Sequence, residues 1–342
     1  MTDTKNGDFK GFIEKIEELG HRDAITSITF LSDGRIASSC LDGRIYIYNK
    51  DTYERENMLD IFEYIFYITQ LSDNNLIACC GSIENNILRI YKINKGFMNY
   101  DLIQKLEGHK DWVWKAIEIE KNKLISSSKD NTIKIWEKID NHYLLFLIAS
   151  PISRYMGFEK PRNYICKKTI AVSNKNNKKP INIIRANENE IAAYSSEDKY
   201  IKFLDIKNDF NEVATINNII SSFDPNSIYV IQNNILLVGG LDSSGLYLID
   251  SKKHEVISVV LNNIREINSI LKLSNENILI GCKDENSKNS IIEYKFSNND
   301  LIKINSKEDA HNNDIYALVE LDNGKIASCS ADNRIIIWKL IN

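Results

Sequence analysis

A sheet-forming unit that ends in tryptophan and recurs along the chain is the feature that most constrains the fold. Its clearest copy runs from Gly108 to Glu137, GHKDWVWKAIEIEKNKLISSSKDNTIKIWE. Three runs at 112–119, 123–128 and 132–136 have strand character and are joined by short polar turns. Alternation is clearest in the third run, where Ile133 and Ile135 point to one side. The stretch predicts a small antiparallel sheet.

Four side chains in this unit predict a buried hydrogen-bond network. They are His109 before the first strand, Ser126 in the second, Asp130 in the turn and Trp136 in the third. If the strands pair as a meander, the imidazole lies between Asp130 and Ser126, with the Trp136 N–H directed into the same patch. Such a network satisfies polar groups whose burial would otherwise be costly.

The same four positions recur elsewhere with the same spacing. The two further sets are His311, Ser328, Asp332 and Trp338, and His21, Ser38, Asp42 and Tyr48. Weaker copies end at Tyr91, Leu204, Ile249 and Tyr294, so that repeat ends are 43 to 45 residues apart, except for 68 residues between Trp136 and Leu204. One sheet cannot bury both of its faces, so the repeats must stack on one another. The count is seven.

The pairs Gly108-His109 and Trp136-Glu137, together with Asp130, resemble a WD repeat. The resemblance implies an all-β, seven-bladed β-propeller of four-stranded antiparallel blades, with residues 1–342 as a single domain. Residues 9–19 alone would suggest an amphipathic helix. The last blade has only three strands of its own, however, so we expect residues 9–17 to supply its fourth strand and close the ring.

Charge, cysteine content and the absence of long apolar runs limit the classes of function and the cellular compartment. The formal charge of −4 argues weakly against a general nucleic-acid binder. The six cysteines form no CxxC pair, and five fall in expected strands, which favours a reducing compartment. The first residues lack the apolar core of a secretory signal, and 143–149 is too short to span a membrane. We expect a cytoplasmic protein, with the nucleus possible, that is monomeric as a propeller.

The long interval between Trp136 and Leu204 contains a basic stretch at about 151–180, expected as an insertion between blades three and four. It has eight basic residues against Glu159 alone. Tyr155, Phe158 and Tyr164 are interleaved with them, which would suit RNA, an anionic surface or an acidic protein. The alternative is a solvated loop with an outer-strand extension, which we favour because most charge runs are simply exposed.

Catalysis is not expected. Ser126, His109 and Asp130 are the residue types of a hydrolase triad, but three copies at identical spacing suit a structural role better than a single active site. Cys79 and Cys80 are adjacent on a strand and cannot hold one metal ion together. No metal or cofactor site is predicted. A propeller enzyme with a site in the central channel is a low-ranked alternative.

In propellers of this family, partners usually dock on the top face, formed by the starts of the first strands and by residues before the turn aspartate. Carried over by position, the first-strand sites are Ala24, Thr26, Tyr64, Phe66, Trp112, Trp114, Asp224, Asn226, Glu266, Asn268, Asp314 and Tyr316, with Pro180 and Asn182 approximate for blade four. The pre-turn sites are Leu41, Gly81, Lys129, Glu197, Leu241, Lys283 and Ala331.

Aromatic residues cluster on adjacent blades two and three of this face, and Tyr316 lies one blade beyond blade one. Such side chains are favoured binding anchors. The opposite arc, Asp224, Glu266 and Asp314, is acidic, so a partner with an apolar anchor at one end and basic residues at the other would fit. The alternative is that Trp112 and Trp114 pack between blades. The sequence predicts a non-catalytic scaffold that binds protein or peptide partners within a multiprotein complex.

Overall fold

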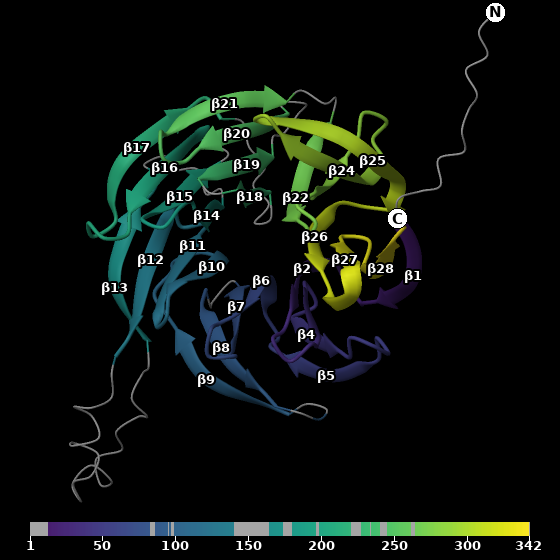
Figure 1. Cartoon of the computed structure of the whole chain (residues 1–342). Helices are drawn as coiled ribbons and strands as arrows, with labels where there is room; N and C mark the ends of the chain where they lie inside the picture. The colour runs from purple at the N-terminus through teal and green to yellow at the C-terminus, as the bar shows by residue number, and fades with distance from the viewer. Residues whose placement is uncertain are drawn as a thin grey trace, which may run out of the picture.

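The computed structural model describes residues 13–82, 86–94, 96, 99–139, 164–173, 180–195, 198–219, 227–232, 234–239, 245–260 and 264–341. These residues form seven four-stranded antiparallel sheets arranged as a ring. In Figure 1 the first strand of each blade lies toward the centre of the ring and the fourth lies at the periphery. The predicted seven-bladed propeller is therefore confirmed.

The first four blades follow the chain in order, from inner to outer strand. Blade one is β2 (Ile25–Phe30), β3 (Ile36–Cys40), β4 (Arg44–Tyr48) and β5 (Arg55–Asp60). Blade two is β6 (Tyr64–Gln70), β7 (Leu76–Gly81), β8 (Leu88–Ile93) and β9 (Tyr100–Leu106). Blade three is β10 (Val113–Glu120), β11 (Lys123–Ser128), β12 (Thr132–Lys138) and β13 (Tyr164–Ala171). Blade four is β14 (Ile181–Arg185), β15 (Glu190–Ser195), β16 (Tyr200–Asp205) and β17 (Asn211–Asn217).

The remaining three blades complete the ring. Blade five is β18 (Ile228–Gln232), β19 (Ile235–Gly239), β20 (Leu246–Asp250) and β21 (Glu255–Val260). Blade six is β22 (Glu266–Lys272), β23 (Ile278–Lys283), β24 (Asn289–Ser297) and β25 (Asp300–His311). Blade seven is β26 (Ile315–Glu320), β27 (Lys325–Ser330), β28 (Arg334–Leu340) and β1 (Ile13–Gly20), with a short 3-10 turn, η1 (Asp322–Gly324), between β26 and β27.

The N-terminal strand closes the ring as predicted. β1 pairs antiparallel with β28, with Lys15 opposite Trp338 and Leu19 opposite Ile335. The expected range, 9–17, is displaced from the observed strand at 13–20, and residues 9–12 lie outside the described residues. The helical alternative is wrong for the described part, because pairing with an edge strand outweighs the local periodicity.

The predicted repeat ends occupy one structural position. Each sits on the third strand of its blade, opposite a buried Ile or Leu of the second strand; the pairs are Tyr48–Ile36, Tyr91–Leu76, Trp136–Leu124, Leu204–Ile191, Ile249–Leu236, Tyr294–Ile278 and Trp338–Ile326. The weak copies are therefore in the same register as the strong ones.

The hydrophobic core lies between blades. Alternate residues of one strand face opposite neighbours: Ile45 and Ile47 of β4 pack with blade two, whereas Tyr46 and Tyr48 pack with blade seven. Both faces of a blade are thus covered, which explains strands with almost no polar alternation, such as β7. Among the described residues, no helix has the length and hydropathy needed to cross a bilayer.

The residues of the basic stretch fall in different parts of the fold. Tyr164–Ala171 is β13, the outer strand of blade three, paired with β12. The additional residues of the long interval therefore lie between the third and fourth strands of blade three, at 140–163, rather than between two blades. Those residues and 174–179 are outside the described part of the chain.

Candidate functional site

The four-residue set of blade three forms a continuous hydrogen-bond chain. His109 Nδ1 is 2.9 Å from Asp130 Oδ2, and its Nε2 is 2.8 Å from Ser126 Oγ. Trp136 Nε1 donates to the same Ser126 oxygen at 2.8 Å. Blade seven repeats this geometry at distances of 2.9, 2.7 and 2.7 Å in the set His311, Asp332, Ser328 and Trp338.

Protonation of this network follows from its contacts. Burial opposes ionisation of Asp130, but hydrogen bonds from His109 and Thr132 hold the pKa of its carboxyl well below the usual value. Burial lowers the pKa of His109 in spite of the neighbouring Asp130. The neutral imidazole then donates a hydrogen bond from Nδ1 to Asp130 and accepts a hydrogen bond from the Ser126 hydroxyl at Nε2.

This arrangement does not suit nucleophilic catalysis. Ser126 is fully buried, and the His109 side chain has no exposed surface, so a substrate could not reach the hydroxyl. The hydroxyl oxygen also accepts the Trp136 N–H, which withdraws the electron pair that a nucleophile needs. The contacts describe a clamp that joins the loop before the inner strand to the second and third strands.

Blade one differs from the expected network. His21 Nε2 lies 2.9 Å from Ser38 Oγ and 3.1 Å from Tyr48 OH, as the repeat predicts. Asp42, however, accepts a hydrogen bond from Tyr46 OH at 2.9 Å and bonds with Arg44 instead of His21. Without a carboxylate partner, burial lowers the pKa of His21 to about 4.

β-Bulges define the top face. In five blades the register between the inner and second strands shifts near the start of the inner strand and skips one residue; the skipped residues are Thr26, Phe66, Trp114, Asn268 and Tyr316. A bulge re-aims the extra side chain relative to the strand. All five are positions that sequence reasoning assigned to the top face, although the bulge itself was not foreseen.

The aromatic cluster consists of Tyr64, Phe66, Trp112 and Trp114. Phe66 stacks on Trp112 with ring centroids 5.0 Å apart and on Trp114 with ring centroids 5.1 Å apart, so it contacts both indoles. Tyr64 meets Trp112 edge-on at 6.5 Å. The cluster joins adjacent blades two and three, as the sequence predicted.

Two neighbours fix the position of Trp112. A Cβ on Gly81 would lie only 2.6 Å from Trp112 Cδ1, so the indole occupies the space that a side chain there would fill. On the other side, Lys129 Nζ lies 4.0 Å from the Trp112 ring centroid, a cation–π contact. Lys129 also donates its backbone N–H to Trp112 O at 2.9 Å, which holds the pre-turn residue beside the start of the inner strand.

The alternative that the tryptophans pack between blades holds for part of the cluster. Phe66 is only 8% exposed, and its stacking on both tryptophans is a contact between blades. Trp112 and Trp114 nevertheless keep intermediate exposure, and Tyr64 is 51% exposed. The cluster therefore combines a packed base with an accessible surface.

Phe62 is an exposed aromatic residue that sequence reasoning missed. It precedes β6 by two residues, is 84% exposed and has φ of 61°, a conformation that bulky residues rarely adopt. Its loop is fixed on both sides: Ile61 N donates to Gly43 O at 2.9 Å, and Glu63 forms a buried ion pair with Arg89 at 2.6 Å. Only the position of Phe62 next to Tyr64 could have indicated it.

The opposite arc is less acidic than expected. Lys283 Nζ lies 3.3 Å from Glu266 and 3.4 Å from Asp314, so a lysine from the predicted pre-turn set bridges the two carboxylates. Burial disfavours the charged lysine, but the two carboxylates outweigh it and raise its pKa. Asp224 lies outside the described residues. Tyr316 is on β26, one blade from blade one, with intermediate exposure.

The described part of the basic stretch is partly neutralised. Lys168 pairs with Asp209 at 2.6 Å. Lys167 is described as well, but most of the basic residues of the stretch fall outside the described residues; these are Arg154, Lys160, Arg162, Lys175, Lys178 and Lys179. The RNA or anionic-surface alternative therefore remains a prediction about those segments.

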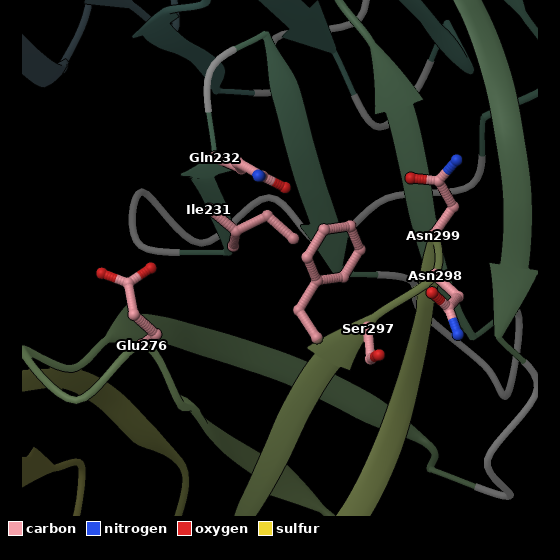
Figure 2. A pocket seen from close by; sticks show the side chains of 7 residues that line it. Ile231, Gln232, Glu276, Ser297, Asn298 and Asn299 are labelled. Atoms are coloured by element: carbon pink, nitrogen blue, oxygen red, sulfur yellow. The ribbon is translucent and has the colours of Figure 1, made fainter.

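The opposite, bottom face has a pocket of about 400 Å³ between blades five and six. Figure 2 shows Ile231 and Gln232 on one side of it and Asn298 and Asn299 on the other. Its one charged lining residue, Glu276, pairs with Lys272 at 2.5 Å. Within the part of the chain that the structure describes, no group of three His, Cys, Asp or Glu side chains could hold a metal ion.

Comparisons with known proteins agree with this geometry. The family model "WD domain, G-beta repeat" matches residues 13–49, 100–137 and 303–339. Each match begins in the outer strand of the preceding blade and runs through the first two strands into the third strand of blade one, three or seven, the blades with the strong motif. The WD repeat-containing protein 55 homolog of Dictyostelium discoideum is 33% identical over 124 residues, covering 33% of this chain and 27% of that protein. The protein transport protein sec13 of Aspergillus oryzae is 39% identical over 57 residues, 16% of this chain and 19% of that protein.

The chain thus aligns with only about a quarter and a fifth of the length of these two relatives. Among solved structures, the WD40 β-propeller domain of Doa1 superimposes with a TM-score of 0.70 at 16% identity, covering 96% of this chain and 98% of that one. At this identity the likeness concerns the fold. Together with the three repeat matches and the seven-bladed ring, it shows that the chain is a seven-bladed β-propeller with WD40 repeats at blades one, three and seven.

Proposed function

We propose that this chain is a non-catalytic scaffold that binds a partner protein or peptide on the top face of its propeller. WD40 propellers typically act as protein-interaction scaffolds. The finer assignment to this face rests on one observation, the aromatic cluster of Tyr64, Phe66, Trp112 and Trp114, which has a packed base and an accessible surface.

Phe62 supports the same face. Its left-handed backbone costs on the order of 1 kcal/mol for a residue with a side chain, and its exposed ring gains little from contacts within the chain. A strained, exposed aromatic residue held by a fixed loop is better explained by a contact with another molecule. Aromatic residues in rigid positions make favourable anchors because little side-chain entropy is lost on binding.

The cellular setting belongs to the same proposal. Cys40, Cys79, Cys80, Cys282 and Cys329 are buried cysteines that form no disulfide among the described residues. Burial raises the pKa of Cys40 and Cys80 to about 12. Such thiols are unreactive core residues, which suits a reducing cytoplasmic or nuclear environment.

The test compares partners that co-purify with the wild type and with the double variant Phe62→Gly, Tyr64→Ser. Both positions are exposed, and glycine tolerates the backbone of Phe62, so the variant should melt close to the wild-type temperature. We expect specific partners to be lost from it by at least about tenfold, as removal of two aromatic anchors implies.

The matched control is the double variant Leu102→Ser, Ile302→Ser. These residues lie on outer strands β9 and β25 and are 43% and 53% exposed, so the loss of apolar surface is similar. Partners should remain bound to this control. Equal loss from both variants, or retention of every partner by the top-face variant, would exclude the proposed binding face.

A further inference from the structure

We infer that the partner segment bound by the aromatic cluster presents a carboxylate beside its bulky apolar side chain, and that Lys129 recognises this carboxylate. The inference rests on the proposed function, because it specifies the chemistry of the ligand at the same site. It concerns a peptide segment with an Asp or Glu side chain near an aromatic or aliphatic anchor.

Lys129 is placed on the surface that such an anchor would cover. Its backbone N–H donates to Trp112 O at 2.9 Å, which fixes the residue beside the cluster. Its side chain lies over the indole, with Nζ 4.0 Å from the ring centroid. The ammonium group has three donor hydrogens, and a π face is a weak substitute for a hydrogen-bond acceptor.

The carboxylates of the turn after β11, of the loop before β10 and of the loop before β6 are engaged elsewhere. Asp130 accepts from His109 and from the backbone N–H of Lys110, and Glu63 is paired with Arg89. Asp111 Oδ1 accepts the Trp112 backbone N–H. Among the residues that the structure describes, Lys129 therefore has a cation–π partner and no carboxylate within ion-pair distance.

Binding would change the surroundings of this cation. An apolar side chain on the exposed face of Trp112 displaces the ammonium group from the ring and removes water around it. A cation that loses both its π partner and its hydration is unfavourable unless an anion replaces them. A carboxylate in the ligand restores a charge-assisted hydrogen bond, whereas a basic residue at the same place is repelled.

The other side of the face does not impose the opposite preference. Glu266 and Asp314 share Lys283 as a counter-ion, so one of these two negative charges is compensated within the described part of the chain. The uncompensated charge beside the described aromatic surface is positive. The inferred carboxylate concerns the end of the ligand that meets the aromatic cluster, and basic residues at the other end of the ligand stay a prediction.

The experiment selects phage-displayed random dodecapeptides on the intact propeller. We expect enriched peptides to contain an aromatic or aliphatic residue close to Asp or Glu. For a representative synthetic peptide, replacement of that Glu by Gln should weaken binding at least about fivefold, as loss of a charge-assisted bond implies. The variant Lys129→Glu should weaken the Glu peptide at least about tenfold and bind its Glu→Lys counterpart better than the wild type does.

Lys110→Glu is the matched control, because Lys110 is an exposed lysine in the loop just before β10. It should leave the ratio of Glu to Gln peptide affinities unchanged. Lys129→Gln, which keeps the length of a polar side chain, serves as a second variant if the charge reversal lowers the melting temperature, and it should abolish the preference for Glu over Gln.

The outcomes separate the two proposals. Peptides that bind the wild type, lose affinity to Trp112→Ala and ignore both Lys129 variants would overturn the role of Lys129 and leave the top-face function standing. Selected peptides that bind Trp112→Ala as tightly as the wild type would count against the top-face function itself. A preference for acidic peptides that persists in Lys129→Glu would assign it to another cation and overturn the inference.

Discussion

Tyr46 determines the hydrogen-bond partners of His21 in blade one. It is paired with Ser38 in the same register as Lys134 opposite Ser126 and Ile336 opposite Ser328. Neither of those two residues has a phenol, whereas Tyr46 donates its hydroxyl to the turn aspartate and packs edge-on against His21 with centroids 4.7 Å apart. One substitution on the third strand therefore removes the carboxylate from an otherwise intact motif.

This difference predicts a pH dependence that belongs to His21. Its pKa is about 4 in the folded chain, against an ordinary value near 6.5. Between these values the unfolded chain binds a proton at this position and the folded chain does not, so stability rises with pH through this window. The contribution is complete above about pH 6.5 and is lost toward pH 4, by roughly 3 kcal/mol in all.

Urea unfolding of the wild type and of His21→Gln at pH 7, 6 and 5 measures the effect. The amide can still bond with Ser38 but does not titrate, so the variant should lose less stability than the wild type as the pH falls. The lowered pKa of His109 acts in the same direction in both proteins and cancels in the comparison. Parallel pH curves for the two proteins would contradict the prediction.

At the scale of the strand and the blade, periodicity in the sequence predicted most of what the structure contains. Strand order, seven repeats and the position of Trp136 followed from alternation and from the recurring motif. The bulges at Phe66 and Trp114 could not be foreseen, because a register shift depends on how two strands pair and leaves no local signature in either one. The exposed Phe62 was missed for a related reason, since its fixed loop depends on Arg89 of β8 and on Gly43 in the turn between β3 and β4.

The clamp of blade three makes a prediction at this same scale. Asp130 accepts hydrogen bonds from His109, the Lys110 backbone and Thr132, and so joins the loop, the turn and the third strand. Asp130→Ala leaves these donors unsatisfied, and the free energy of unfolding should fall by about 1 to 3 kcal/mol in chemical denaturation. Asp322→Ala is the control: its side chain is 57% exposed and pairs with Lys50, so its loss should cost less than about 0.5 kcal/mol. Equal effects would mean that the network does not stabilise the blade.

Over the whole molecule, the ring depends on interfaces between blades and on a single non-sequential strand. Seven hydrophobic clusters each draw residues from two neighbouring blades, so no blade has a core of its own. Polar contacts reinforce this arrangement on the bottom face, where Glu118 of blade three accepts from Ser72 of blade two and Glu320 of blade seven accepts from Ser274 of blade six. In blade seven, β1 covers the outer edge of β28, which would be an unpaired edge strand without it (Figure 1).

Removal of β1 should therefore loosen the ring at one place first. A chain that lacks residues 1–20 loses the antiparallel pairing with β28, the Glu18–Arg334 ion pair at 3.3 Å and the packing of Leu19 against the cluster between blades seven and one. We expect a melting temperature lower by more than about 5 °C, which corresponds to a few kcal/mol for a chain of this size. Hydrogen exchange should accelerate in β28 before it does so in β12, the equivalent strand of blade three, because an edge strand opens more readily than a paired one.

A chain that lacks only residues 1–12 is the control, because it keeps the strand and should melt within about 1 °C of the full chain. Uniform exchange across all blades in the 1–20 deletion would show instead that the seven blades open as one unit.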